Sequence, residues 1–285
     1  MKKSWNWLVL ASCLCVPLTA HAHRAWLLPS ATVLSGDDVW ITVDAAVSND
    51  LFYFEHFPLR IANLGGPTAQ LPGGRGRPAN LSITGPDGSA VPHHNGSMGR
   101  YRSTFDVHLT QRGTYKIAVT NTGVFARYKE DGRDKRWSGT LEAFAKEVPQ
   151  NAEGLQATYM QSRNEVFVTS GKPTAGTLKT TGSGLELVPV THPNDLVAGS
   201  AATFQLLLAG KPAPNLKVSI VPGGNRYRDK LGDMTLTTDD AGKFSVKWPE
   251  PGMYWMEAVV RDDKASGGIK ERRAGYVVTL EVLPP

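Results

Sequence analysis

Cysteine is almost absent from this 285-residue sequence. Its two copies are Cys13 and Cys15, so the chain from residue 23 onward contains none. Thiol catalysis, disulfide bonds and cysteine-ligated metal sites are therefore excluded for that part of the chain. Long hydrophobic runs are also missing, because no segment reaches the roughly 20 apolar residues that a membrane-spanning helix needs.

Strong charge of one sign is missing as well. The formal net charge is +5, and it falls to +3 if Lys2 and Lys3 are removed. The remaining excess is scattered, with no long Lys/Arg run to follow a phosphate backbone, so we expect no nucleic-acid partner. The sequence also lacks His-Glu-x-x-His, the phosphate-binding Gly-x-x-x-x-Gly-Lys and the Gly-x-Ser-x-Gly nucleophile turn. It therefore predicts a protein that is not an enzyme.

The first 22 residues have the layout of a secretory signal peptide. Lys2 and Lys3 are followed by an apolar stretch over 7–18 and then by Ala20-His21-Ala22, a small-x-small cleavage site. We expect cleavage after Ala22 and a periplasmic protein that begins at His23. A leader with this layout that is followed by a cysteine-free chain is typical of a bacterial periplasmic protein.

Two alternatives to this cleavage remain open. The apolar stretch could stay uncleaved as an anchor. Leu10-Ala11-Ser12-Cys13 also matches a short lipobox, in which Cys13 would be lipidated. Cleavage after Ala22 fits the peptide layout best.

The remaining chain has the composition and residue spacing that are typical of antiparallel β structure. Its 29 glycines and 19 prolines separate short apolar runs. Residues 39–43 and 216–221, for example, alternate or carry the β-branched residues typical of strands. We predict an all-β fold of two tandem β-sandwich domains. The first covers 23–175 and has loop insertions, and the second covers 185–285 and is immunoglobulin-like or transthyretin-like.

Two insertions interrupt the first predicted sandwich. Residues 49–77 contain an aromatic cluster at 52–57 followed by a Gly/Pro-rich stretch. Residues 129–137 are charged and are predicted to form an exposed loop. The segment 138–147 is the best helix candidate, because apolar residues recur at helical spacing before Pro149.

Three elements resemble a known family. They are His23-Arg24-Ala25-Trp26-Leu27-Leu28-Pro29 at the expected mature start, Leu34-Ser35-Gly36-Asp37-Asp38-Val39, and a run of turns and strands from 207 to 254. With them the chain resembles exported proteins of unknown function that are grouped with the periplasmic component of cobalt/nickel ABC-type uptake systems. The resemblance implies a part in transition-metal uptake and a partner such as an inner-membrane transporter.

Histidine is the residue type best suited to metal binding here. Imidazole ligates nickel, cobalt, copper and zinc where thiolates are absent. After cleavage, His23 would present a free α-amine beside its imidazole, a pair of donors that chelates Cu(II) or Ni(II). The α-amine has an unperturbed pKa of about 7.7–8.0, so it can lose its proton to a metal. His23 could equally be a first residue with no role.

Other histidines could complete such a site. His56 lies in the aromatic cluster beside Glu55 and is the residue we pair with His23. His93 and His94 are adjacent, so they could share one metal only from a loop, where we place them. His108 is expected at the surface of a strand and His192 at the junction of the domains.

The sequence thus predicts a non-enzymatic binding or accessory protein that takes a divalent transition metal, nickel, cobalt or copper. Its candidate ligands are His23, His56, His93 and His94. A second hypothesis is a scaffold module without metal that docks to an outer-membrane receptor or a glycan through the aromatic cluster at 52–57. A third is an oxidative copper enzyme that uses the N-terminal histidine.

Overall fold

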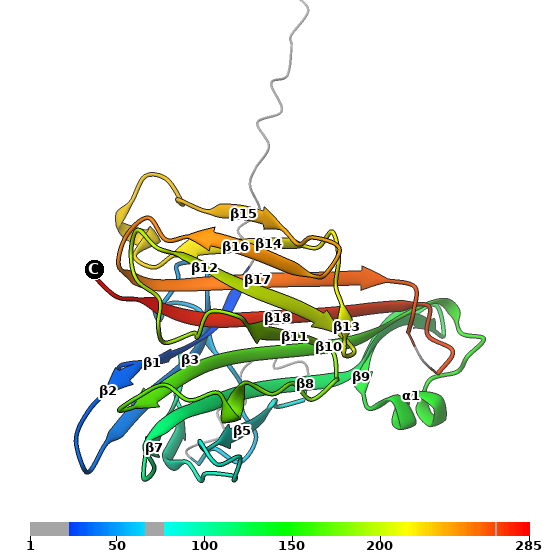
Figure 1. The fold of residues 1–285 in the computed structure, drawn as a ribbon. Coiled ribbons are helices and arrows are strands. Elements are labelled where there is room, and N and C mark those ends of the chain that lie inside the picture. The colour runs from blue at the N-terminus through cyan, green and yellow to red at the C-terminus, as the bar shows by residue number, and fades with distance from the viewer. Residues whose placement is uncertain (1–22, 66–76, 266) are drawn as a thin grey trace, which may run out of the picture.

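The computed structural model describes residues 23–65, 77–265 and 267–285, and the predicted leader lies outside them. These residues form an all-β fold, as predicted, and their strands make up three sheets (Figure 1). Within the described ranges, no helix has the length and apolarity needed to cross a membrane.

The strands group into an N-terminal, a central and a C-terminal sheet. The N-terminal sheet contains β1 (Arg24–Pro29), β3 (Trp40–Ser48), β7 (Ser103–His108) and β6 (His94–Met98), with β4 (Phe57–Pro58) paired to β3. The central sheet runs in the order β15 (Met234–Thr237), β14 (Lys217–Pro222), β17 (Gly252–Asp262), β18 (Glu271–Val282), β10 (Glu153–Ser170), β8 (Gly113–Glu130) and β5 (Asn80–Thr84). It also includes β2 (Val33–Leu34) beside β10 and β9 (Arg133–Gly139) beside β8. The C-terminal sheet contains β11 (Leu185–Pro189), β12 (Ala201–Leu208), β13 (Lys211–Pro212) and β16 (Lys243–Lys247).

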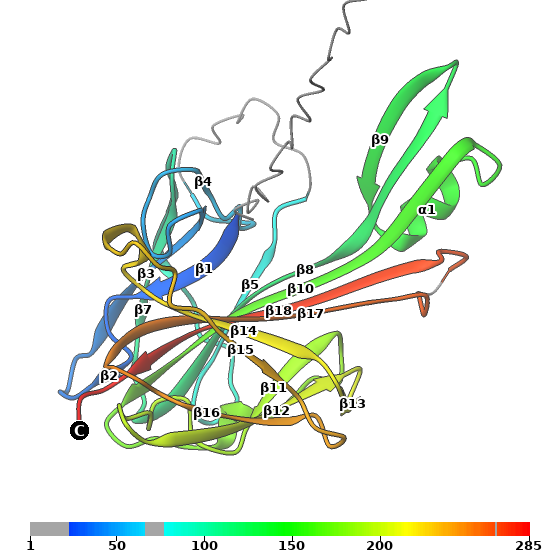
Figure 2. The ribbon, with the colours of Figure 1, turned by 90° about the horizontal axis from the view of Figure 1, so that it is seen from above.

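The central sheet belongs to both sandwiches. Its β10 comes from the first half of the chain and pairs in parallel with β18 from the second half, from Thr158 opposite Glu271 to Val166 opposite Thr279. The N-terminal sheet covers one face and the C-terminal sheet covers the other (Figure 2). The side chains of β10 alternate accordingly, because Val166 packs into the N-terminal core and Phe167 into the C-terminal core.

An arm extends from one end of the central sheet (Figure 2). It consists of α1 (Leu141–Glu147), β9 and the adjoining ends of β8 and β10. The buried Phe144 of α1 packs in the hydrophobic core of this arm. Residues 129–137, predicted to be a loop, instead form most of a β-hairpin. The prediction failed because β9 is exposed from Arg133 to Arg136 and shows no apolar alternation. The sequence does indicate the turn, because Asp131-Gly132 is a dipeptide typical of two-residue hairpin loops. Both residues take the positive φ values that such a turn requires.

The helix is also shorter than predicted. It begins after Thr140, whose side-chain oxygen accepts a hydrogen bond from the backbone N–H of Ala143. This N-cap ends the preceding strand and satisfies one of the free amides of the first turn. Ser138 and Gly139, which the prediction placed in the helix, are the last residues of β9.

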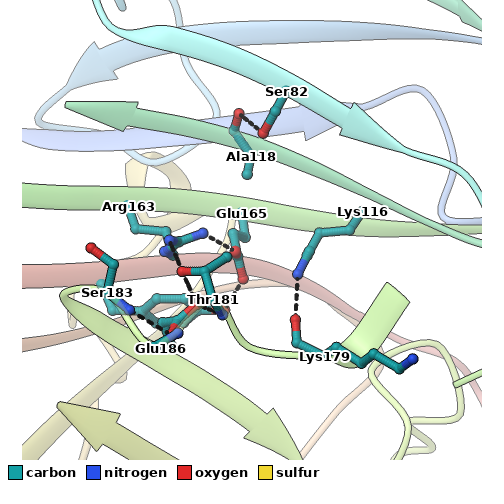
Figure 3. Close-up of polar contacts among 11 residues, drawn as sticks. Ser82, Lys116, Ala118, Arg163, Glu165, Lys179, Thr181, Ser183 and Glu186 are labelled. Atoms are coloured by element: carbon teal, nitrogen blue, oxygen red, sulfur yellow. Dashed lines mark hydrogen bonds and ion pairs between the residues drawn. The ribbon is translucent and has the colours of Figure 1, made fainter. Parts of the chain in front are cut away.

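A buried ionic cluster lies where the two halves meet (Figure 3). Arg163 on β10 contacts Glu165 at 3.1 Å and Glu186 on β11 at 3.6 Å, and both carboxylates are at least 95% buried. Glu186 also accepts hydrogen bonds from the backbone amides of Thr181, Gly182 and Ser183. The Tyr276 hydroxyl on β18 donates to Glu165 at 2.8 Å, and burial raises the pKa of Tyr276 well above its usual value. The cluster therefore links β10, β11 and β18.

We predict that Arg163→Met destabilises the protein by about 3–5 kcal/mol, because it leaves two buried carboxylates without their cation. The free energy of unfolding in urea measures this change. Lys146→Met is the matched control, since Lys146 forms an exposed i,i+4 pair with Glu142 that is worth about 0.3–0.5 kcal/mol. Equal and small losses in both variants would contradict a structural role for the cluster.

A partly buried acid, Glu257, lies on the central sheet. Burial raises the pKa of Glu257 on β17, and the nearby Arg273 and Arg24 only partly oppose this. Because the folded-state pKa exceeds the unfolded one, ionisation of Glu257 costs stability as the pH rises through the folded pKa.

We therefore expect Glu257→Gln to stabilise the protein at pH 7. The gain should disappear as the pH falls below the unfolded-state pKa of about 4.3, where the parent side chain is also neutral. Thermal unfolding from pH 4 to pH 8 tests this, with Glu250→Gln, an exposed glutamate, as the control. A Glu257→Gln variant that is less stable than the parent at pH 7 would show that electrostatic attraction to Arg273 and Arg24 outweighs the cost of burial.

Candidate metal site

His23 and His56 meet at the end of β3. β1 pairs with β3 so that Arg24 lies opposite Ser48, which puts His23 beside the turn that follows β3. β4 pairs with β3 so that Phe57 lies opposite Val47, which brings the preceding His56 to the same end. The centroids of the two imidazole rings are 4.0 Å apart, with their planes tilted by 32°. The structure thus brings together the two histidines that the sequence analysis paired.

Both imidazoles are open to solvent. The half-exposed ring of Phe57 lies against them, 4.6 Å from His56 and 5.9 Å from His23 between centroids. The two histidines therefore have an apolar neighbour on one side and water on the other.

The turn after β3 fixes the orientation of His23. Its Nδ1 lies 2.9 Å from the side-chain Oδ1 of Asn49. An amide oxygen only accepts, so Nδ1 is the donor of this hydrogen bond. Asn49 was not among the sequence-predicted site residues, because a single asparagine in a loop has no distinctive pattern.

Glu55 supports the same turn. One of its carboxylate oxygens accepts hydrogen bonds from the backbone amides of Asn49 at 2.8 Å and Asp50 at 2.9 Å. In the sequence this carboxylate directly precedes His56. Its observed partners are backbone groups, so it orders the turn that carries Asn49.

The aromatic cluster is largely structural. Phe52 and Phe54 each lie 5.5 Å from the ring of the fully buried Trp26, and they pack in the contact between β1 and the central sheet. Tyr53 is more exposed, but the guanidinium of Arg226 lies 4.0 Å above its ring. Within the surface proposed for glycan or receptor docking, Phe52 and Phe54 thus contribute to internal packing, whereas Tyr53 and Phe57 are exposed.

The structure separates His93 and His94. β6 begins at His94, so this pair lies at the start of a strand and not within a loop. The His93 ring faces the buried Phe105, whereas the His94 ring faces Trp40 on the outer surface of the N-terminal sheet. Their side chains point to opposite faces, as adjacent strand residues do, and they do not share a site.

The remaining two histidines have protein partners. His108 stacks on Trp40 with 4.2 Å between ring centroids, and its Nε2 lies 2.8 Å from Asp38. His192 lies near Thr114 and Thr174, and its Nδ1 accepts a hydrogen bond from the backbone amide of Asn194. It therefore fastens the segment that joins the two halves, in line with its expected place at the junction.

Two imidazoles alone are an incomplete transition-metal site. Among the described residues, no three His, Cys, Asp or Glu side chains form a metal-binding group. If the chain is cut after Ala22, the α-amine of His23 supplies a third nitrogen beside these two rings. The residues present therefore fit a divalent transition metal only in the processed chain.

Arg24 lies between this site and the second sandwich. Its guanidinium donates to the backbone oxygen of Asn49 at 3.1 Å and lies 5.5 Å from the ring of Trp255 on β17. The indole of Trp255 in turn donates to the backbone oxygen of Ala25 at 2.9 Å. The start of β1 is thus held by residues from both halves of the chain.

A separate cleft of about 970 Å³ opens where β10 and the β17–β18 hairpin diverge. Its lining includes Phe125, Arg127, Phe144, Ile269 and Glu271, and no histidine. It therefore does not belong to the site at the end of β3.

Solved structures with similar chains share little sequence with this protein. The D0-D1 domain of intimin is 12% identical, with 90% of this chain and 97% of that chain covered and a TM-score of 0.22. Trypsin-activated alpha-2-macroglobulin from Escherichia coli is 12% identical, with 90% and 16% covered and a TM-score of 0.21. A DUF3823 family protein from Bacteroides uniformis is 13% identical, with 72% and 88% covered and a TM-score of 0.24.

The sequence matches no curated protein. A family model does match, over residues 20–262, and covers the N-terminal sheet, most of the central sheet and the C-terminal sheet. The match includes all six histidines from His23 to His192. The chain belongs to the family described as domain of unknown function DUF4198.

Proposed function

We propose that this protein is exported, cut after Ala22, and binds a divalent transition metal at its new N-terminus as a non-enzymatic accessory protein of nickel or cobalt uptake. The observation that carries the proposal is the 4.0 Å separation of the His23 and His56 rings at the predicted cleavage point. The metal is cargo in this proposal, and the protein's task is to hold it and pass it on.

The donor chemistry supports this assignment. The α-amine of His23 can form a chelate ring with Nδ1 of the same residue, and His56 adds a second imidazole from the neighbouring loop. Nitrogen donors of this kind suit nickel, cobalt and copper. Metals bind amine and imidazole nitrogens only in their unprotonated form, so affinity should fall at acidic pH.

The exposure of the site supports a carrier. Both imidazoles face solvent, so a metal there could be reached by a partner without unfolding of the chain. The link to uptake, and to an inner-membrane transporter or an outer-membrane receptor as the partner, comes from the sequence resemblance. The family to which the chain belongs has no assigned function.

We expect protein that begins at His23 to bind Ni(II), Co(II) or Cu(II) in calorimetric titrations. His23→Ala and His56→Ala should each weaken binding at least tenfold, because each removes an imidazole donor. His94→Ala is the matched control and should leave the affinity unchanged, since this exposed ring packs on Trp40.

A second form of the protein tests the role of the α-amine. Addition of Gly-Ser-Gly-Ser before His23 converts the amine into an amide and leaves every side chain in place. We expect the extended form to lose most of its affinity. Binding by the parent no tighter than by an unrelated periplasmic protein, or equal binding by the parent and both histidine variants, would overturn the proposal.

A further inference from the structure

We infer that the side-chain oxygen of Asn49 is a further metal ligand, beside the donors of His23 and His56. The inference rests on the proposed function and deepens it. It starts from the 2.9 Å contact between Asn49 Oδ1 and His23 Nδ1. Nδ1 is the ring nitrogen that closes a chelate with the α-amine of the same residue, so its present partner stands where the metal must enter.

The spacing of the two atoms suits a shared metal. Metal–nitrogen and metal–oxygen bonds are about 2.0–2.1 Å long, so two ligands at a right angle around one ion are about 2.9 Å apart. The hydrogen-bonded Nδ1 and Oδ1 already have this separation.

The backbone of Asn49 is held from two sides. Its N–H donates to Glu55, and its carbonyl oxygen accepts from the guanidinium of Arg24. The next residues are tied to the second sandwich, because Asn225 accepts from the backbone amide of Leu51 and donates to the side chain of Asp50. The side chain of Asn49 therefore projects from a fixed turn, which lowers the entropy lost when it binds a metal.

Asn49 completes a set of four donors. Two imidazole nitrogens, one amine nitrogen and one neutral amide oxygen are the mixed nitrogen and oxygen ligands of tetragonal Ni(II) and Cu(II) sites. The inference thus favours these two ions over Zn(II), which prefers a tetrahedral arrangement.

The test uses protein that begins at His23, with Ni(II) and Cu(II) as probes. We expect Asn49→Ala to weaken binding about 10–100-fold. Asn49→Asp, which keeps an oxygen in the same place, should restore the affinity. Asn121→Ala is the control, because Asn121 donates to the backbone of Arg77 and lies on β8.

A spectroscopic readout separates a ligand from a residue that only shapes the turn. In the Cu(II) form, Asn49→Ala should gain an equatorial water, seen by pulsed electron paramagnetic resonance in water enriched in the magnetic oxygen isotope as an oxygen hyperfine coupling that the parent lacks. If Asn49→Ala does not fold, Asn49→Gln replaces it in the test. This variant moves the amide oxygen by one methylene, and we expect it to show the same added equatorial water.

Two failures can be told apart. If the parent binds metal through His23 and His56 but Asn49→Ala keeps its affinity, or loses affinity without the water signal, Asn49 is not a ligand and the proposed function stands. If the parent itself binds no metal, the proposed function fails and the inference fails with it.

Discussion

The parallel pairing of β10 with β18 is the contact on which the rest of the molecule depends. It joins the strands of both halves into one central sheet, whose two faces serve two different cores. Adjacent residues of β10 therefore belong to different sandwiches, as Val166 and Phe167 do. The pairing also brings Tyr276 to Glu165, which ties the buried ionic cluster to β18. Two sandwiches joined only by a linker would have neither the shared sheet nor this cluster.

The same pairing places the candidate site. With β18 and β17 beside β10, the outward side of β1 packs on the second half of the chain through Trp26 and Trp255. Phe52 and Phe54 fill this contact, and they anchor the loop that carries His56. The aromatic cluster thus explains why an exposed loop has a defined position. The proximity of the two histidines follows from the packing beneath them, since neither ring is buried.

Local sequence patterns predicted much of this structure, but they did not predict the pairing of strands that are far apart in the sequence. Alternation and turn residues indicated the strands and the all-β class, because those signals lie within a few neighbouring residues. The parallel β10–β18 pair joins segments about a hundred residues apart. No residue pattern in either strand identifies the strand with which it pairs. The hairpin that contains β9 was missed since β9 itself is exposed over most of its length and shows no apolar alternation. His23 and His56 could be paired from chemistry, but Asn49 could not, because its role depends on a turn that only the register of β1 with β3 defines.

The predicted cleavage site lies directly before β1, so the fold would determine the position of the new N-terminus. Cleavage after Ala22 would create an amine at the start of β1, whose register with β3 is set by six residue pairs from Arg24 to Pro29. That register places residue 23 within reach of Asn49 and His56, so the position of the new amine would be determined by the sheet. A shift of β1 by one residue would turn Trp26 out of its buried contact and Leu27 out of the N-terminal core. The hydrophobic side chains that stabilise the fold therefore also hold the first residue of the processed chain in place.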